Sequence, residues 1–321
     1  MSRWYYTNMV LVKNEYYWDK DAVKLSRIED VMVDDQSTRK ALFEQGELDF
    51  TTSVPLASFL RHQQEGETVS KDEVLVNYIE CNLRQPPLDD ARVRKALALA
   101  VDRDAYEEKI MQGTDTPGYA LVLSGTPNPV TGQDFRAEGG DLFHTDIAAA
   151  RKLLAEAGYP DGKGFPTVTL LYSNNLLNEM YAEAIQQMWQ QNLGIQVELQ
   201  AQEWPVFNQN RTLGEFQLSY YGYCADYFDP MTFLECWMTG NPNNCSGYSN
   251  PQFDALVNKA KNTVDQGVRM QIMHEAEAVV VNDMPALPLT FEKANYLKQP
   301  SVKGIVLSGG LVYFKYAWIE P

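Results

Sequence analysis

The sequence predicts an α/β fold made of two structural units. Segments rich in aromatic and β-branched residues, which are typical of strands, alternate along the chain with segments of helical periodicity. The chain has 321 residues, which is long for one compact domain. Its apolar share of 45% and charged share of 22% are those of a folded protein, so the composition gives no sign of disorder.

The expected strands are short runs of aromatic and β-branched residues that end at glycine, proline or polar turns. In chain order they cover residues 3–12, 23–33, 47–52, 74–83, 165–172, 195–199, 216–221 and 287–291, and a last pair lies within 305–319. Pro86 and Pro87 follow the strand over 74–83, and a proline cannot continue a strand ladder.

The expected helices begin at residues that can cap a first turn. Ser37 and Thr145 are the predicted N-caps of two helices, which end at Gly46 and Gly158. In chain order the helices cover residues 37–45, 55–64, 89–101, 102–111, 146–157, 176–191, 203–210, 231–238, 251–262 and 264–281, with a long surface loop over 114–140. The strand–helix–strand runs within 23–52 and 165–199 each predict a βαβ unit.

The charge balance bears on the class of partner. The formal net charge is −16, whereas a nucleic-acid-binding surface needs clustered lysine and arginine. We therefore expect no nucleic-acid partner and a mild preference for cations. No apolar run approaches the ~20 residues that span a bilayer, and the first residues show no basic region followed by an apolar one. No secretory signal is therefore expected in the chain as given.

The cysteines and histidines give little support for a metal site or a cofactor. None of the four cysteines forms a C-x-x-C pair, and the three histidines are scattered, so we predict neither a metal nor a cofactor. Cys236 and Cys245 flank the loop TGNPNN, which could bring them within disulfide range. Spacing alone does not fix disulfide geometry, so a bridge and two separate thiols both remain open.

Signatures of catalysis are scarce. The sequence has no G-x-S-x-G turn, no H-E-x-x-H helix and no phosphate-binding loop with the required spacing. Serine, histidine and aspartate residues are present, but no spacing selects a triad. We therefore do not expect an enzyme.

The stretch YYGYCADYFDP, residues 220–230, combines aromatic residues with two carboxylates. Asp226 stands among tyrosines, and the ordinary alternative for such an aspartate is a turn or a helix cap. Asp229 precedes Pro230 and can fill that capping role, which leaves Asp226 for another. A carboxylate surrounded by aromatic rings suits a ligand ammonium group, so Asp226 is the leading candidate for a binding residue.

Three further residues are candidates for the wall of the same binding site. Tyr78 and Glu80 share one face of the strand over 74–83, because side chains alternate along a strand. Glu80 lies between Ile79 and Cys81, which indicates either a buried partner or a cleft. Trp204 begins a short helix, where a core position is the ordinary alternative to ligand contact.

Several motifs occur together and in order: NEYYWD, ALFEQGELDF, PPLDDARVRKALALAVDRD, AARKLLAEAGYPDG, YCADYFDPMTFL, SGYSNPQFDALVNKA and PALPLTF. In this combination the sequence closely resembles the periplasmic oligopeptide-binding proteins of ABC importers, over essentially the whole chain. The resemblance implies a periplasmic-binding-protein-like (class II) fold, with one complete lobe and part of the other. It places part of the first lobe at 1–74, the second lobe at 75–293 and a returning tail of the first lobe at 294–321. It also implies an N-terminally truncated chain.

The resemblance assigns roles to individual residues. Asp226 corresponds to the aspartate that pairs with the α-ammonium group of the peptide. The other implied ligand-binding residues are Trp204, Arg211, Tyr223, Tyr78, Glu80, Thr51 and Thr52, and also Tyr220, which stands where some members have an arginine. Glu292 stands where some members of the family have a tyrosine in a binding pocket. Some members of the family have a disulfide at the position of Cys224, but the position of its partner is Leu75 here. The resemblance therefore implies a buried thiol at Cys224 and favours the Cys236–Cys245 bridge.

The function implied by the resemblance is that of the substrate-binding component of an ABC importer. Such a protein holds oligopeptides in extended form between two lobes and delivers them to membrane permease subunits. The implied location is extracytoplasmic, in the periplasm or as a cell-surface lipoprotein, and the implied state is a monomer. The alternatives are another solute on the same fold, such as an oligosaccharide, a nickel chelate or haem, and a peptidase.

Overall fold

The computed structural model describes residues 8–33, 35–52, 54–308 and 311–320, so residues 3–7 of the first predicted strand lie outside the described part. The chain divides into two compact units. Unit 1 consists of Met1–Asp72 and Lys293–Pro321, and unit 2 of Glu73–Glu292. The lobe boundaries expected from the sequence fall after residues 74 and 293, close to the division between the two units. The two strands that lead from one unit into the other are β4 (Thr68–Cys81) and β9 (Ala286–Lys298).

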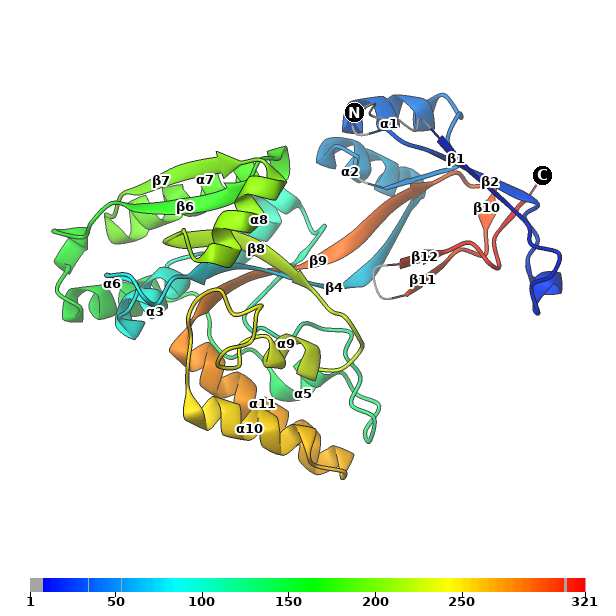
Figure 1. Ribbon diagram of the computed structural model, residues 1–321. Helices are drawn as coiled ribbons and strands as arrows, with labels where there is room; N and C mark the ends of the chain where they lie inside the picture. Colours follow the sequence, from blue (N-terminus) through cyan, green and yellow to red (C-terminus); the bar gives the residue numbers. More distant parts are fainter. Residues whose placement is uncertain (1–7, 34, 53, 309–310, 321) are drawn as a thin grey trace, which may run out of the picture. The chain divides into compact units, whose positions relative to one another are not determined.

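Unit 2 confirms the predicted α/β class (Figure 1). Its strands, besides parts of β4 and β9, are β5 (Thr116–Pro117), β6 (Val168–Ser173), β7 (Val197–Gln202) and β8 (Leu218–Cys224). Its helices are α3 (Ala91–Leu99), α4 (Arg103–Tyr106), α5 (Phe135–Gly139), α6 (Ile147–Glu156), α7 (Leu176–Leu193), α8 (Trp204–Leu213), α9 (Met231–Glu235), α10 (Pro251–Lys261) and α11 (Gln266–Asp283). Short turns of other helix types cover Glu107–Met111 and Pro160–Gly162.

The main sheet has the strand order β3-β9-β4-β8-β6-β7, with β5 paired to β9. β8 is antiparallel to β4 and parallel to β6, and β6 is parallel to β7. Since α7 connects β6 to β7, the βαβ unit predicted within 165–199 is confirmed. β8 thus lies in the interior of the sheet, with a hydrogen-bonded neighbour on each side.

Helices α7 and α8 cover opposite faces of this sheet. Tyr181 of α7 stacks on Tyr220, and Phe207 of α8 stacks on Tyr221, with ring centroids 5.3 and 6.4 Å apart. Adjacent residues of a strand point to opposite faces, so the two helices lie on different sides of β8. The helix α7 is held further by Trp189, whose indole N–H donates to the carbonyl of Leu97 at 2.8 Å.

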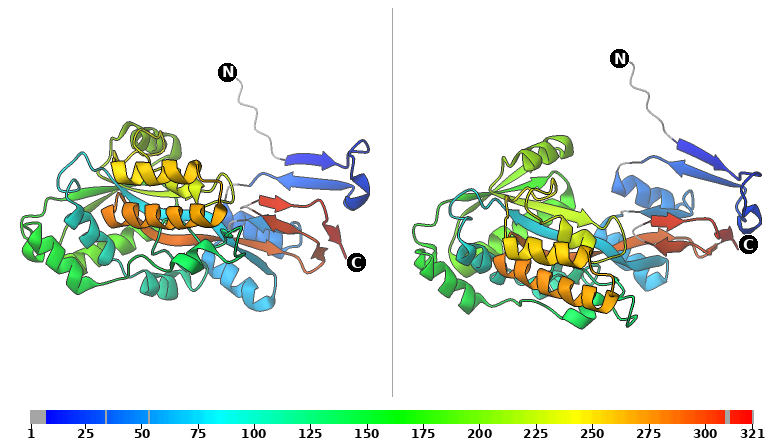
Figure 2. Two further views of the ribbon diagram at one scale, coloured as in Figure 1. Left: turned by 90° about the horizontal axis from the view of Figure 1, so that it is seen from below. Right: turned by 60° about the horizontal axis from the view of Figure 1, so that its bottom comes forward.

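A second layer of unit 2 consists of α10 and α11, which pack side by side with α9 against both (Figures 1 and 2). α11 contributes Glu277, which is fully buried and accepts hydrogen bonds from the backbone of Leu121 and Val122. Arg136 donates to the same carboxylate at 2.7 Å. The segment predicted as a long surface loop, 114–140, is therefore fastened to α11 by a buried ion pair, and it contains the short helix α5.

Unit 1 is built from short elements around a small core of Phe43, Phe59 and Leu297. Its helices are α1 (Gln36–Glu44) and α2 (Leu56–Glu65), with a short 3-10 turn over Lys20–Ala22. Its strands are β1 (Asn8–Val12), β2 (Arg27–Val31), β3 (Phe50–Thr52), β10 (Val302–Lys303), β11 (Val306–Ser308), β12 (Leu311–Tyr313) and β13 (Trp318–Ile319).

The βαβ unit predicted within 23–52 is wrong. β2 pairs with β1, antiparallel, in a two-stranded sheet, whereas β3 pairs with β9 in the main sheet. The two strands that flank α1 therefore belong to different sheets. The pairing partner of β3 lies almost 250 residues further along the chain, which no local pattern reveals.

Two predicted helix caps and one strand length also need correction. The N-cap of α1 is Asp35, whose carboxylate accepts from the backbone N–H of Thr38 at 2.8 Å, and not Ser37. The N-cap of α6 is Asp146, one residue after Thr145. β9 was expected to end at 291 but continues to Lys298, because the strand runs on into unit 1 and pairs there with β3.

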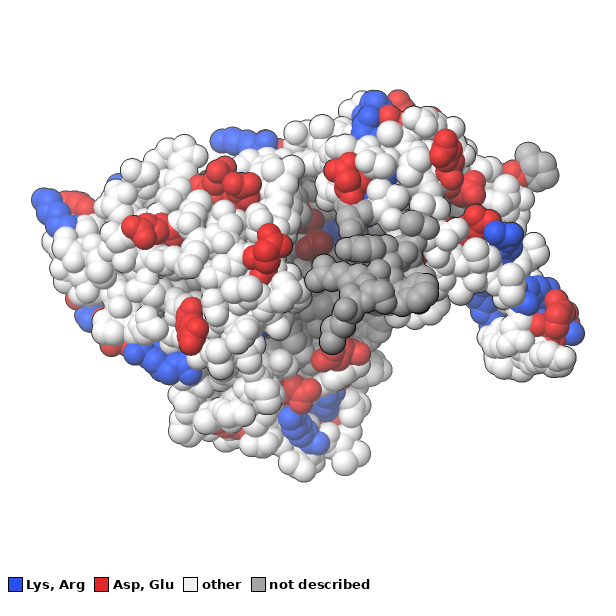
Figure 3. All heavy atoms as spheres, turned by 45° about the horizontal axis from the view of Figure 1, so that its top comes forward, with Lys and Arg blue, Asp and Glu red and all other residues white. Residues whose placement is uncertain are grey.

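No helix in the described ranges has both the length and the apolar character that a membrane crossing requires. Acidic side chains are spread over the face drawn in Figure 3, where lysines and arginines form small, separate groups. The surface seen in that view follows the acidic composition of the chain.

Candidate functional site

The first half of the stretch over 220–230 lies on β8, and the alternation of its side chains creates two different surfaces. In the ladder between β4 and β8, Tyr78 is paired with Tyr221 and Val76 with Tyr223. Tyr221 and Tyr223 therefore share a face with Tyr78, and Tyr220 points to the other face. We call the first of these faces the Tyr221 face.

A buried ion pair lies under the Tyr221 face. Arg211, on α8, donates from Nε to the Oε2 atom of Glu80 at 2.8 Å. Glu80 is fully buried and Arg211 is 4% exposed. The guanidinium group also lies over the ring of Tyr221, 3.6 Å from its centroid. Arg211 thus neutralises Glu80 and supports Tyr221 from below.

The electrostatics of this pair follow from its burial. Loss of hydration raises the pKa of the Glu80 carboxyl, and the charge of Arg211 counteracts that rise. Removal of either partner would leave an unpaired charge in the interior. The pair is therefore a structural support that depends on both residues.

Aromatic rings extend the Tyr221 face toward solvent. Trp204 is 53% exposed and stacks on Tyr221 with an interplanar angle of 11° and a centroid distance of 6.3 Å. On the other side, Tyr78 packs against Tyr221 and edge-on against Trp237 at 5.4 Å. The result is a wall of rings that is buried at Tyr78 and exposed at Trp204.

Asp226 lies just beyond the end of β8 and is exposed. Its Oδ2 atom accepts a hydrogen bond from the hydroxyl of Tyr223 at 3.1 Å, and its backbone N–H donates to Thr232 at 3.2 Å. Tyr223 is itself fixed by an edge-on contact with Phe233. Within the described ranges no ion pair involves the Asp226 carboxylate. An exposed and oriented carboxylate beside aromatic rings can bind a cation.

Asp229, three residues later, has a different environment. Arg269 binds both of its carboxylate oxygens, at 2.6 and 2.8 Å, and the backbone N–H of Met231 donates to Oδ1 at 2.9 Å. Asp229 therefore accepts from the first turn of α9, close to the predicted capping role, although the N-cap residue itself is Pro230. Its ion pair with Arg269, which the sequence did not indicate, ties this turn to α11. The negative charge of Asp229 is already neutralised by Arg269 within the fold.

Comparison with known proteins identifies the family. The model of the bacterial extracellular solute-binding proteins, family 5, matches residues 3–245. The chain belongs to this family. The dipeptide-binding protein DppE of Bacillus subtilis is 35% identical over 302 residues, which cover 93% of this chain and 55% of DppE.

Two solved structures of other proteins are similar to this family 5 chain. A periplasmic oligopeptide-binding protein of Borrelia burgdorferi has a TM-score of 0.85 at 29% identity, over 99% of this chain and 63% of that one. Listeria monocytogenes OppA bound to peptide has a TM-score of 0.82 at 26% identity, over 98% and 62%. The predicted periplasmic-binding-protein fold is confirmed. The chain spans less than two thirds of the length of these relatives.

Four of the predicted ligand-binding residues of the family 5 chain lie in the interior of unit 2. Glu80, Arg211 and Tyr78 are buried under the Tyr221 face, and Tyr220 is buried on the opposite face against Tyr181. Contact of these four side chains with a ligand stays a prediction. The first three support the wall from beneath, and Tyr220 belongs to the packing between β8 and α7.

Glu292, the other departure noted in the sequence, lies on the same side as Tyr220. It is part-buried and accepts a hydrogen bond from the side-chain amide of Asn77 at 3.2 Å. Burial raises the pKa of its carboxyl, and the hydrogen bond from Asn77 opposes the rise. Glu292 is therefore a part-buried acidic group with no cation bound to it in the described residues.

Thr51 and Thr52 lie on β3 in unit 1, opposite Leu297 and Tyr296 of β9. Thr51 is buried and Thr52 is exposed. Their contact with a ligand stays a prediction.

The cysteine predictions require correction. All four cysteines lie in the described ranges, and they form no disulfide with one another, so the predicted Cys236–Cys245 bridge is absent. Cys236 and Cys245 are buried thiols near the carbonyls of Phe233 and Pro242, at 3.0 and 3.9 Å. Cys224 is exposed and not buried, because it stands at the end of β8. The residue paired with it on β4 is Leu75.

Two central residues of the wall, Tyr221 and Trp237, are not among the ligand-binding residues predicted from the sequence. Tyr221 contacts Arg211, Trp204 and Tyr78. The signal for it was present, because Tyr221 and Tyr223 are two positions apart on a predicted strand and must share a face. Trp237 follows a helix in a loop-rich segment, and no local pattern indicates its contact with β4.

Proposed function

We propose that this chain binds oligopeptides as part of the substrate-binding component of an ABC importer, and that it is not an enzyme. The observation that carries the proposal is the carboxylate of Asp226, exposed and unpaired with a cation in the described ranges, at the edge of an aromatic wall. The α-ammonium group of a peptide complements it through a charge-assisted hydrogen bond and a cation–π contact with Tyr223. The similarity to a binding protein solved with peptide supports this assignment.

In this proposal the residues have separate tasks. Asp226 anchors the ammonium group, and Tyr223 and Trp204 contact the peptide. Main-chain hydrogen bonds supply affinity that does not depend on the peptide sequence. The protein acts outside the cytoplasm as a monomer, and its partners are the permease subunits of the importer.

The test compares a tripeptide that has a free amino terminus with its N-acetylated form, titrated calorimetrically into the chain. Loss of the ammonium group should weaken binding at least about tenfold, which corresponds to about 1.4 kcal/mol. A charge pair that is fully desolvated on binding would contribute more, about 2–5 kcal/mol. In Asp226→Asn the two peptides should bind with the same affinity.

Asp141→Asn is the matched control, because Asp141 is an exposed aspartate of unit 2 away from β8. It should keep the full preference for the free amino terminus. If Asp226→Asn retained that preference too, the assignment of the anchor would be wrong.

The absence of catalysis is tested separately. The chain is incubated with a peptide pool, separated from unbound peptide and analysed by mass spectrometry. Intact peptides in the bound fraction support a binding protein, whereas fragments that accumulate with time would identify a peptidase.

A further inference from the structure

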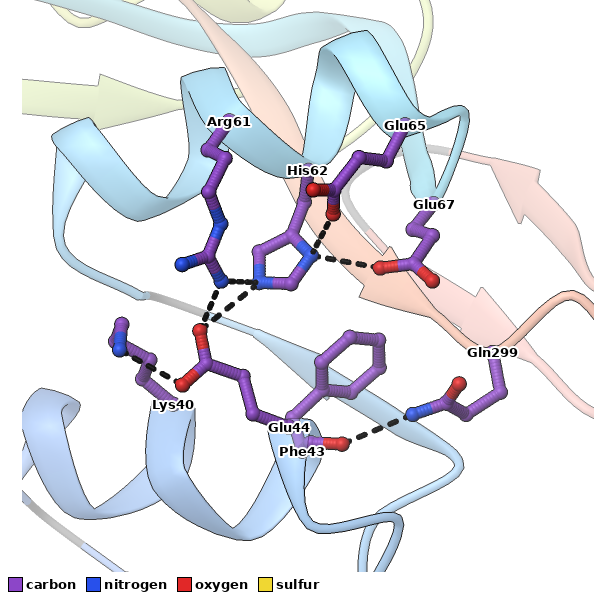
Figure 4. Close-up of polar contacts among 8 residues, drawn as sticks. All are labelled: Lys40, Phe43, Glu44, Arg61, His62, Glu65, Glu67 and Gln299. Atoms are coloured by element: carbon purple, nitrogen blue, oxygen red, sulfur yellow. Dashed lines mark hydrogen bonds and ion pairs between the residues drawn. The ribbon is translucent and has the colours of Figure 1, made fainter.

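A histidine and two glutamates converge where α2 ends in unit 1. His62 and Glu65 lie in the last turn of the helix, and Gly66 ends it with a left-handed conformation, φ 74°. The backbone N–H of Glu67 then donates to the carbonyl of His62 at 3.0 Å, so the chain folds back on its own last turn. This turn brings Glu67 beside the His62 ring (Figure 4).

Both carboxylates approach the same ring nitrogen. The Nδ1 atom of His62 is 2.7 Å from Glu67 and 3.3 Å from Glu65. His62 is 3% exposed and packs edge-on against Phe43 at 5.4 Å, so the ring cannot easily turn away. One N–H group is thus shared by two negatively charged acceptors. A divalent cation in the place of that single proton would balance their charge.

The opposite ring nitrogen has partners for both of its protonation states. Nε2 is 3.0 Å from a guanidinium nitrogen of Arg61 and 3.5 Å from Oε1 of Glu44. When Nδ1 carries the proton, Nε2 accepts from Arg61. When Nε2 carries the proton, it can donate to Glu44. The second arrangement matches the carboxylate–histidine pairing that orients metal-binding imidazoles.

We propose that Nδ1 of His62 and the carboxylates of Glu65 and Glu67 bind a divalent transition-metal ion, with Zn²⁺ as the best match. Imidazole and carboxylate are usual zinc ligands, at about 2.0–2.2 Å, which places ligand atoms about 3.3 Å apart around a tetrahedral ion. The three ligand atoms already lie within 4.8 Å of one another. The Glu65 oxygen has this spacing from Nδ1, and the Glu67 oxygen lies about half an ångström closer to Nδ1 than this spacing.

The environment supports an ion with an open coordination position. The Glu65 side chain is 52% exposed and that of Glu67 is 24% exposed, so water can complete the shell. The neutral ring binds the ion through Nδ1 while its proton transfers through solvent to Nε2, and no net charge is lost from the ring. Arg61, which is half exposed, can then turn away from Nε2 and keep its ion pair with Glu44.

Two cations position Glu44 to accept a hydrogen bond from the Nε2–H group of His62. Lys40 donates to its Oε2 atom at 2.8 Å and Arg61 contacts Oε1. These two contacts hold the Glu44 carboxylate in place beside the Nε2 atom of His62.

The scattered positions of the three histidines predict no metal site from the sequence. The proposed site needs only one histidine, and the pattern H-x-x-E-x-E became a cluster only through the left-handed turn at Gly66. The other reading is that the cluster merely fastens α2 to β4 by hydrogen bonds. The two readings differ in what they predict for Glu67→Gln, since a glutamine oxygen still accepts from Nδ1–H but is a poor zinc ligand.

The experiment is a calorimetric titration of Zn²⁺ into the full chain, freed of affinity tags and treated with a chelator. A Cys224→Ser background removes the exposed thiol, because a cysteine thiolate is itself a usual zinc ligand. We expect one ion per chain, and an affinity at least about tenfold weaker in Glu65→Gln and in Glu67→Gln. Glu47→Gln, an exposed glutamate of the same unit outside the cluster, should bind like the parent chain.

A second measurement locates the ion on the ring. Nitrogen NMR of the histidines should show that Zn²⁺ displaces the proton from Nδ1 of His62 and leaves one on Nε2. No binding, binding of several ions with equal strength in all variants, or coordination through Nε2 would each overturn the proposal. His62→Ala is not needed, so the test does not depend on a variant that would disturb the Phe43 core.

Discussion

Replacement of Arg211 by methionine tests the role of the buried ion pair under the Tyr221 face. Methionine keeps most of the volume of the side chain and removes only its charge and hydrogen bonds. Glu80 is fully buried and would lose the cation that lies 2.8 Å from its carboxylate. We therefore expect a large loss of stability without a large cavity.

The magnitude follows from the burial of both partners. Removal of one member of a buried pair costs about 3–5 kcal/mol, because the remaining charge is uncompensated. Unit 2 comprises Glu73–Glu292, and for a domain of that size the melting temperature falls by about 2–4 °C per kcal/mol. Arg211→Met should therefore lower the melting temperature of this unit by roughly 6–20 °C.

The pH dependence gives the sign of the effect. Without Arg211 the pKa of Glu80 rises further above its unfolded value, because burial is no longer opposed. For a raised carboxyl pKa, stability is fully present below the unfolded value and is lost as the pH rises through the folded value. The difference between Arg211→Met and the parent chain should hence be larger at pH 7 than near pH 4.

The assay is thermal unfolding followed by circular dichroism at both pH values, with two companion variants. Arg92→Met removes an exposed arginine that pairs with Asp90, and it should cost at most about 1 kcal/mol. Glu80→Gln combined with Arg211→Met should recover part of the loss, because no charge then remains buried. A loss no larger than that of Arg92→Met, or strictly additive single changes, would refute the reasoning.

Two further predictions concern groups away from this pair. Glu292→Gln should raise the melting temperature at pH 7, by about 2–4 °C per kcal/mol of burial cost removed, and the glutamine still offers an acceptor to Asn77. If thermal unfolding showed no larger gain in melting temperature at pH 7 than near pH 4, the raised pKa of the Glu292 carboxyl would be contradicted. Asp146→Ala should lower the free energy of unfolding, measured by chemical denaturation, by about 0.5–2 kcal/mol, because the backbone N–H of Ala149 loses the carboxylate acceptor that lies 2.9 Å away. Thr145→Ala should cost less than Asp146→Ala, and the reverse order would restore the sequence-based cap.

The elements that the sequence predicted well are those whose pattern is local. The unit β6–α7–β7 was predicted because α7 buries one face at helical spacing and is flanked by two short apolar strands. The pairing of β3 was not predictable in the same way. β3 has three residues, and its partner on β9 lies near the other end of the chain. A strand of that length carries no information about which edge it joins.

The site shows the same division between local and distant information. Asp226 and Asp229 could be told apart in the sequence, because Pro230 follows Asp229 and marks the start of a helix. For Glu80 the sequence left a buried partner and a cleft open, and it did not identify the partner. Its partner Arg211 lies 131 positions later, and only the packing of α8 on the sheet brings the two together. The sequence therefore indicated an exposed carboxylate at Asp226, but not the contact between Glu80 and Arg211 beneath the wall.

The charges around β8 and α9 give a physical reason to single out Asp226. Three other carboxylates of this region are each bound to a base within the fold, at 2.6–2.8 Å: Glu80 to Arg211, Asp229 to Arg269 and Glu235 to Lys261. Their negative charge is largely cancelled where it stands. Asp226 has a tyrosine hydroxyl and not a cation as its side-chain partner. Of these four carboxylates only that of Asp226 is without a bound base in the described residues, so it is the one among them that a peptide ammonium group could neutralise.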